Sequence, residues 1–317
     1  MLTIGIDLGG TNIKAALVDD KKGILHKFSF STEAEKGVQH IIDKLAEAIQ
    51  VAAAKAEGPI SGVGVGSPGV ISYDRTSVSN PPNFPGWTTV NLAAELKKKT
   101  HFDVYVDNDA NLMALGSSHF GSGKAYANFI MVTLGTGVGG GIILQNKLFR
   151  GATGGAGELG HVSIDYAGPD SNSPTRGGIE AYLGQRFLSR LAWERISKEP
   201  SNPMYDRFKD NPDQLEPREL TAQANEGNML AIDILRDAGE KLGYAIVNYI
   251  HVLDIRKIIV SGGVALAGEW ILKPAREAAL SRMLAPYRTD FEIIAETLGN
   301  DAALLGAASL PYEYLPD

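Results

Sequence analysis

A pattern of strand, glycine turn and strand occurs twice in this chain, and it restricts the possible folds more than any other feature. The first copy is IDLGGTNIKAALVD at residues 6–19, and the second is TLGTGVGGGIILQN at residues 133–146. Gly9 of the first copy aligns with Gly135 of the second, and apolar residues flank both turns. Two copies of one pattern in a chain of this length indicate two related lobes that face each other.

The second copy also fits the dinucleotide-binding pattern G-x-G-x-x-G, through Gly135, Gly137 and Gly140. That pattern serves a dinucleotide where it leaves a strand and opens a helix, with an acidic residue about 20 positions further on. Here the glycines are followed by IILQNKLF, which is a strand pattern with an asparagine-containing turn. We therefore expect a hairpin turn whose bare N–H groups approach a phosphate, since glycine permits the backbone angles of such a concave site.

The composition is that of a soluble globular protein of about two domains, because 44% of the 317 residues are hydrophobic and 21% are charged. A net charge of −7 and the lack of a large basic tract argue against a nucleic-acid partner. The absence of cysteine excludes disulfides, thiolate metal sites and a cysteine nucleophile. Neither an export signal nor an apolar run of the ~18 residues that a membrane span needs is visible, so we expect a cytoplasmic protein without a membrane partner.

Strand and helix patterns alternate along the chain, which is typical of an α/β protein. We expect a rigid loop over residues 80–87, which contain three prolines, a loop-rich region over 151–180 and an irregular excursion over 198–217. The predicted strands span residues 3–7, 13–18, 24–30, 62–72 with a break at 67–69, 104–109, 129–149 with the glycine turn inside, 257–263 and 291–296. The predicted helices span residues 36–57, 90–100, 110–121, 179–197, 219–253, 264–283 and 300–310.

The first glycine turn combines a carboxylate, bare backbone, a hydroxyl, an amide and a cation. An aspartate beside two glycines and a threonine is the set that magnesium and phosphate require. The alternative is an ordinary Gly-Gly hairpin in which the aspartate only shapes the turn. The residues in question are Asp7, Gly9, Gly10, Thr11, Asn12 and Lys14.

A second polar group lies in VDNDANLMALG, at residues 106–116, where an apolar strand passes into a helix. A purely structural role for Asp109 would be to cap the N-terminus of that helix, but Asp107 or Asn108 can cap it equally well. Asn108, Asp109 and Asn111 together stand at the carboxyl end of a strand, where α/β sheets place binding sites. A lone carboxylate there can take a proton from an attacking hydroxyl.

A third polar group lies in GATGGAGELGHVSID, at residues 151–165, and continues to Glu180. Glu158 and His161 are three positions apart in this glycine-rich stretch. A structural histidine is one alternative, and a metal site is disfavoured because no thiol is near. Two glutamates and a histidine suit hydrogen bonds to several hydroxyls, as a sugar presents.

The motifs DLGGTNIK, NDAN, GTGVGGG, GELGH and SGG occur in the order in which the ROK family of sugar kinases and repressors carries them, and the chain resembles that family over nearly its whole length. The resemblance implies two ribonuclease-H-like lobes, as in actin-like ATPases, with ATP in the cleft between them. It implies a small lobe over residues 1–115, joined by a C-terminal helix over 301–317, and a large lobe over 116–300. A homodimer with no nucleic-acid partner is also implied.

The resemblance implies roles for individual residues as well. Asp109 would be the general base, and Asp7 would hold Mg²⁺, directly or through water. The phosphates of ATP would lie on Gly9, Gly10, Thr11, Asn12, Lys14, Gly135, Thr136 and Gly137, and Gly262 and Gly263 would pack under its adenosine part. The sugar hydroxyls would bind to Asn83, which lies in NFPGW, and to Asn108, Glu158, His161 and Glu180.

The chain departs from the family at its zinc site. The family pattern C-x-C-G-x-x-G-C-x-E, aligned on the final glutamate, places the three cysteines on Ser171, Ser173 and Gly178. Serine and glycine do not replace thiolates as zinc ligands. We therefore expect no structural zinc, with His161 facing the sugar and the loop over 162–179 either ordered by other contacts or mobile.

The expected activity is phosphorylation of a hexose by ATP, with glucose and its 6-hydroxyl as the first candidate. Fructose, mannose, allose and N-acetylmannosamine are alternative substrates, and polyphosphate is an alternative donor whose enzymes carry longer basic stretches. A sugar-sensing repressor of the same family is disfavoured because the DLGGT-like motif begins at residue 7, which leaves no room for a helix-turn-helix before it. An actin-like ATPase without a sugar substrate is disfavoured by GELGH and Glu180.

Overall fold

The computed structural model describes residues 1–314, which group into two compact units. The first unit comprises residues 1–128, 141–157 and 297–314. The second unit comprises residues 129–140 and 158–296. The lobe boundaries that the family resemblance implies stay a prediction.

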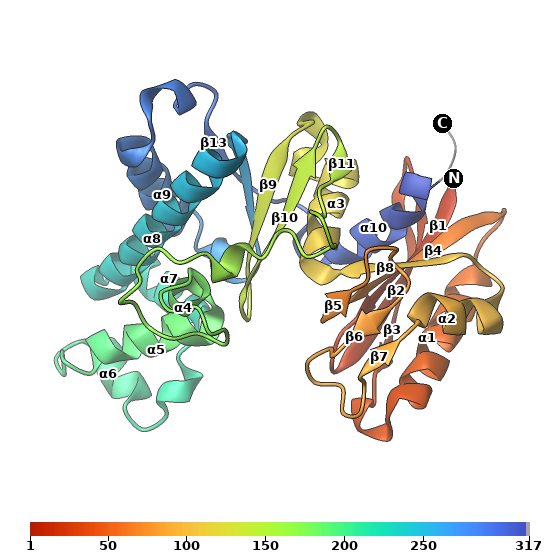
Figure 1. Ribbon diagram of the computed structural model, residues 1–317. Helices are drawn as coiled ribbons and strands as arrows, with labels where there is room; N and C mark the ends of the chain where they lie inside the picture. Colours follow the sequence, from red (N-terminus) through yellow and green to blue (C-terminus); the bar gives the residue numbers. More distant parts are fainter. Residues whose placement is uncertain (315–317) are drawn as a thin grey trace. The chain divides into compact units, whose positions relative to one another are not determined.

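The first unit is built on a five-stranded sheet of order β3-β2-β1-β4-β8 (Figure 1). β1, β2 and β3 are antiparallel, whereas β4 and β8 run parallel to β1, so the carboxyl ends of β1, β4 and β8 meet at one edge. In that register Asp7 lies opposite Gly66, and Gly66 lies opposite Asp107. The strands are β1 (Leu2–Leu8), β2 (Asn12–Asp19), β3 (Gly23–Ser31), β4 (Ile60–Ser67) and β8 (Val104–Asn108).

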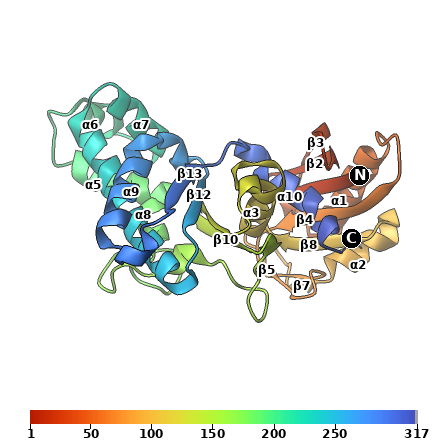
Figure 2. The same cartoon turned by 90° about the horizontal axis from the view of Figure 1, so that it is seen from above.

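Helices cover both faces of this sheet, which explains why its inner strands are apolar on both sides (Figures 1 and 2). One face carries α1 (Val38–Ala53) and α2 (Leu92–Thr100), whose apolar residues join the buried side chains of the strands in one core. The other face carries α3 (Asp109–Phe120) and α10 (Ala302–Ser309). α3 and α10 touch backbone to backbone, since a Cβ added to Gly306 would stand 1.7 Å from the carbonyl oxygen of Leu112.

A small three-stranded sheet, β5 (Val70–Ile71), β6 (Val78–Ser79) and β7 (Thr89–Val90), lies in the same unit. The predicted rigid loop over 80–87 connects its last two strands. The indole N–H of Trp87 donates to the carbonyl of Val78 at 3.2 Å, which fixes the loop to the sheet.

A second five-stranded sheet has the order β11-β10-β9-β12-β13. β9, β12 and β13 are parallel, and β10 follows β9 directly across the glycine turn. A strand and not a helix therefore follows these glycines, which confirms the interpretation against a dinucleotide fold. The strands are β9 (Phe129–Leu134), β10 (Val138–Leu144), β11 (Lys147–Leu148), β12 (Lys257–Ser261) and β13 (Glu292–Ala295).

The second unit contains more breaks in its helices than the sequence patterns predicted. The helix expected over 179–197 is divided, because Gly184 adopts an extended conformation, and the helix expected over 219–253 is interrupted at residues 226–228. In the second break Gly227 has a φ of 85°, and the Asn228 side chain caps the next helix. The helices are α4 (Glu180–Leu183), α5 (Gln185–Ile196), α7 (Pro217–Asn225), α8 (Met229–Leu253) and α9 (Glu269–Arg282).

The excursion over 198–217 is not wholly irregular, because it contains α6 (Pro203–Phe208). Asn202 caps this helix and Pro203 occupies its first turn, a pair of start signals that the sequence displays. Among residues 1–314, none of the helices combines the length and the apolar character that crossing a bilayer requires.

Candidate functional site

The first glycine turn is fixed from its buried side and open on the other. The N–H of Gly9 donates to the carbonyl of Asn12 at 3.0 Å, and the buried Thr32 hydroxyl donates to the carbonyl of Gly9 at 2.7 Å. Gly10, Thr11 and Asn12 are exposed. The turn therefore exposes bare backbone while hydrogen bonds hold its geometry.

Asp7 and Lys14 face each other across this hairpin. The Lys14 ammonium lies 3.3 Å from a carboxylate oxygen of Asp7, and both side chains are partly exposed. One carboxylate with room for substrate phosphates fits the way in which proteins hold Mg²⁺. Asp7 is thus the side chain of this turn that would hold the metal.

Asn83 lies beside the same turn, although it is far from Gly10 in the sequence. A Cβ added to Gly10 would stand 3.5 Å from the Cβ of Asn83. Asn83 has a φ of 70°, a left-handed conformation that asparagine tolerates. The structure therefore brings this predicted sugar ligand next to the predicted phosphate turn.

Asn108, and not Asp109, caps α3. The side-chain oxygen of Asn108 accepts a hydrogen bond from the N–H of Ala110 at 2.9 Å. Asp109 is the first residue of the helix and is exposed, and one of its carboxylate oxygens also accepts from the N–H of Ala110 at 2.8 Å. The positive end of a helix favours an ionised carboxylate at that position.

The neighbouring Asp107 was not among the residues that sequence patterns singled out for the site. It is fully buried, and Arg75 and Arg150, from two distant segments, each place an Nε near its carboxylate at 2.8 Å and 3.1 Å. The position of Asp107 near the end of an otherwise apolar strand is a sequence signal for a special role. The sequence does not indicate that Arg75 and Arg150 are its partners.

The second glycine turn lies against Glu180. The N–H of Gly135 donates to the carbonyl of Gly137 at 2.9 Å, which closes the turn. A carboxylate oxygen of Glu180 accepts a hydrogen bond from the N–H of Val138 at 3.1 Å. Glu180 is buried, and its other oxygen has no hydrogen-bond partner among residues 1–314. The turn and this carboxylate form one polar group in the second unit.

Glu158 and His161 flank a short helical turn, Leu159–His161. The exposed Glu158 carboxylate lies 3.6 Å from Nε2 of His161, while Nδ1 of His161 is buried without a partner in the described part of the chain. A Cβ added to Gly160 would stand 2.0 Å from the carbonyl oxygen of Val138, so this segment packs against the second glycine turn. The structure therefore brings Glu158, His161 and Glu180 to one end of the unit.

A buried tyrosine holds the same segment. The Tyr249 hydroxyl donates to the carbonyl of Leu159 at 2.7 Å. Burial raises the pKa of Tyr249 well above its ordinary value, so the phenol remains a protonated donor.

The loop over 162–179 does not fit the zinc site of the family. The hydroxyls of Ser171 and Ser173 lie 3.4 Å apart, and Gly178 offers no side chain. Serine and glycine are not zinc ligands of the thiolate kind. Over residues 1–314, no group of three or more His, Cys, Asp or Glu side chains is arranged to hold a metal ion.

Hydrogen bonds within the loop join its two sides. The Ser163 hydroxyl donates to the carbonyl of Arg176 at 2.8 Å, and the N–H of Thr175 donates to the Ser173 hydroxyl at 3.2 Å. The N–H of Ile164 donates to the carbonyl of Gly177 at 2.9 Å. Hydrogen bonds therefore order this loop, as expected for a loop that is ordered by contacts other than zinc.

Gly262 and Gly263 follow β12 in the second unit. Gly262 has a φ of 99°, and a Cβ there would stand 2.3 Å from the carbonyl oxygen of Leu134, next to the second glycine turn. No described atom lies within 4 Å of a Cβ placed on Gly263, so its surface is open.

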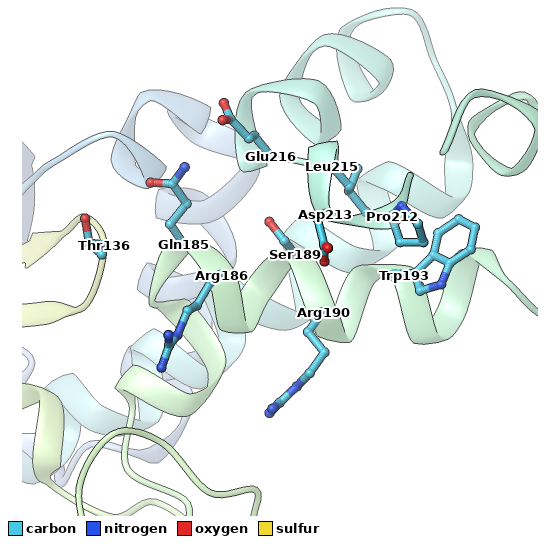
Figure 3. A pocket seen from close by; sticks show the side chains of 10 residues that line it. All are labelled: Thr136, Gln185, Arg186, Ser189, Arg190, Trp193, Pro212, Asp213, Leu215 and Glu216. Carbon is cyan, nitrogen blue, oxygen red and sulfur yellow. The ribbon is translucent and has the colours of Figure 1, made fainter. Parts of the chain in front are cut away.

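A cavity of about 380 Å³ lies in the second unit beside Thr136 of the second glycine turn. This volume falls in the range of small-molecule sites. Gln185, Ser189 and Trp193 project from successive turns of α5 (Figure 3), and Asp213 lines the same cavity. No sequence pattern pointed to these residues. The cavity is lined by Thr136, Gln185, Arg186, Ser189, Arg190, Trp193, Pro212, Asp213, Leu215 and Glu216.

Known proteins resemble this chain over its whole length. The model of the ROK family matches residues 3–313. A glucokinase of Thermotoga maritima is 36% identical over 307 residues, which cover 97% of this chain and 96% of that protein. A glucokinase of Streptomyces coelicolor is 35% identical over 317 residues, which cover 98% of each.

A solved structure extends the likeness to three dimensions. A ROK family glucokinase from Streptomyces griseus, crystallised with glucose and AMPPNP, matches with a TM-score of 0.82 and 32% identity, covering 99% of this chain and 100% of that one. The fold is thus the two-lobe, actin-like ATPase fold, as the sequence analysis expected. The chain belongs to the ROK family, which confirms the resemblance drawn from its motifs.

Proposed function

We propose that this protein transfers the terminal phosphoryl group of ATP to the 6-hydroxyl of a hexose, with glucose as the first candidate. Relatives named glucokinase at 35–36% identity support a hexose kinase of the ROK family. The glucose and AMPPNP bound to the similar Streptomyces griseus enzyme support a sugar and ATP as the two substrates.

The observation that carries the sugar assignment is that only one of the two carboxylate oxygens of Glu180 has a hydrogen-bond partner. One carboxylate oxygen is bound to the N–H of Val138, while the other is buried and has no partner in the described chain. An unpaired buried acceptor is costly, and in native structures a ligand, an ion or water commonly completes such a group. A sugar hydroxyl is the donor that this oxygen lacks, and Nδ1 of His161 offers a second unpaired position nearby.

Asp109 is proposed as the general base. Asn108 supplies the helix cap, so the Asp109 carboxylate is not required for that role. Its exposed position at the carboxyl edge of the sheet suits acceptance of a proton from the sugar hydroxyl. Asn83 and Asn108 are proposed to bind further sugar hydroxyls.

The glycine turns are proposed to hold the phosphates of ATP. Backbone N–H groups stabilise the charge that develops on the transferring group without reorganising. Asp7 would hold Mg²⁺, which when bound neutralises phosphate charge. Lys14, 3.3 Å from Asp7, keeps a positive charge at the same turn.

The cavity beside Thr136 is proposed to take the nucleoside of ATP. Thr136 belongs both to the second glycine turn and to the cavity wall, so a nucleotide with its phosphates on the turn would extend along α5. Hydroxyl, amide and carboxylate groups from Ser189, Gln185 and Glu216 suit a ribose and a base edge, and Trp193 adds an aromatic surface.

A coupled assay of ADP release across hexoses and N-acetylhexosamines, with and without Mg²⁺, tests this function. We expect the highest kcat/KM with glucose, dependence on Mg²⁺, and a product phosphorylated at carbon six by NMR. 6-Deoxyglucose is the matched control, because it lacks the proposed acceptor and should give no sugar phosphate. Absence of sugar-dependent ADP release with every hexose would overturn the proposal, whereas preference for another sugar would overturn only the choice of glucose.

Two further expectations accompany this function. We propose a homodimer, which light scattering on the purified protein tests, and a cytoplasmic location, which cell fractionation tests. A monomer, or recovery in the membrane or exported fraction, would contradict the respective expectation.

A further inference from the structure

Asp107 is the centre of a buried polar network in the first unit. Its side chain is 0% exposed. One of its carboxylate oxygens accepts hydrogen bonds from the N–H of Asn108 at 2.8 Å and from the amide of Asn111 at 3.0 Å. The other lies 2.8 Å from Nε of Arg75 and 3.1 Å from Nε of Arg150.

The charges of this network are balanced. Arg75 also pairs with Glu313, so two guanidinium groups face two carboxylates. Burial alone lowers the pKa of Arg75, but the charges of Glu313 and Asp107 outweigh it and raise that pKa, so the cation is retained. Removing one carboxylate would leave buried positive charge without compensation, which is costly.

The arginines are themselves fixed by the backbone around them. Arg75 has a left-handed φ of 59°, and its carbonyl accepts from the N–H of Val106 at 2.9 Å, on the strand that ends in Asp107. Arg150 donates to the carbonyls of Tyr73 at 2.5 Å and Ser72 at 3.2 Å. Several distant segments therefore converge on one carboxylate.

We propose that Asp107 is a positioning residue for phosphoryl transfer, which with Arg75 and Arg150 fixes the turn on which Asn108 and Asp109 stand. The inference rests on the proposed function. The bond from the N–H of Asn108 to Asp107 sets the backbone one residue before the proposed base. Displacement of a catalytic group by about 1 Å can cost roughly 10²-fold in rate, so a rigid anchor at this point acts on turnover.

The test is Asp107→Asn, which keeps the shape of the side chain but removes its charge. We expect kcat to fall on the order of 10²-fold while the KM of ATP stays within about twofold, since the glycine turns that are proposed to hold ATP lie on other strands. Asp103→Asn is the matched control, because Asp103 precedes the same strand, is exposed, and pairs with Lys97 at the surface. It should keep the wild-type kcat.

A purely structural role would lower the melting temperature and leave kcat per folded molecule unchanged, and that result would overturn the inference. If Asp107→Asn fails to fold, Arg150→Gln replaces it, since this change leaves the Arg75 pair with Asp107 intact. We expect about a tenfold loss of kcat at unchanged KM of ATP, and a wild-type kcat would overturn the inference. A wild-type protein that phosphorylates no hexose would instead overturn the proposed function, and the inference with it.

Discussion

The carboxylate of Glu180 and the N–H of Val138 are joined by a hydrogen bond of 3.1 Å, which ties a buried acid to the second glycine turn. A Cβ added to Gly137 would stand 2.3 Å from the same carboxylate. The acid and the turn therefore share one space, and a change to either one displaces the other.

Gly137→Ala is expected to lower kcat/KM by roughly 10²-fold, because the new methyl group must push Glu180 or the turn out of place. Steady-state kinetics with ATP and the preferred sugar measure the effect. Gly155→Ala is the control, since no described atom lies within 4 Å of a Cβ there and this glycine belongs to neither turn. Equal losses in the two variants would contradict the prediction.

Glu180→Gln is expected to raise the sugar Kd by about 10- to 100-fold, the range that corresponds to losing a hydrogen bond to a charged group. The amide oxygen can still accept from Val138, so the turn is retained. Titration calorimetry with the sugar gives the Kd, and Glu194→Gln, at an exposed position on α5, is the control. An unchanged sugar Kd would remove Glu180 from the sugar site.

Asp109→Asn is expected to keep sugar binding and to lose kcat by about 10²- to 10⁴-fold, the usual contribution of a general base. The helix start is preserved because Asn108 supplies the cap. Pre-steady-state and steady-state assays of ADP release follow the loss. A variant with wild-type turnover would assign the base to another group.

Much of the fold is predictable because its signals are local. The two glycine hairpins have apolar alternation on both sides of the turn, and α1 shows its buried face through the spacing of Ile41, Ile42 and Leu45. The helix breaks at Gly184 and Gly227 were missed because apolar spacing continues through them. The glycine itself indicates a possible helix break at both positions.

The site is less predictable because its partners are distant in the chain. That Asp109 begins a helix follows from the passage of an apolar strand into a helical pattern. The burial of Asp107 between Arg75 and Arg150 does not follow from any local pattern, since Arg75 stands 32 positions earlier in the chain. The cavity beside Thr136 likewise depends on how residues 212–216 fold back against α5.

Gly306→Ala is expected to destabilise the protein by about 1–3 kcal/mol or more, the usual cost of overpacking a well-packed core. The added methyl group would stand 1.7 Å from the carbonyl oxygen of Leu112, so α3 and α10 must separate. Urea unfolding measures the change in free energy. Gly155→Ala, in open space, is the control and should unfold as the wild type does.

Removal of divalent metal is expected to leave the fold intact. The loop over 162–179 is held by hydrogen bonds such as that from the Ser163 hydroxyl to the carbonyl of Arg176. Ser171, Ser173 and Gly178 stand where the family resemblance implies thiolates. Dialysis against a chelator should therefore leave the melting temperature unchanged, and elemental analysis should find less than one zinc ion per chain. Activity should disappear with the chelator and return with Mg²⁺ alone, because Mg²⁺ is proposed to hold the phosphates and not the loop. Stoichiometric zinc whose removal lowers the melting temperature would show that other ligands hold the metal in this protein.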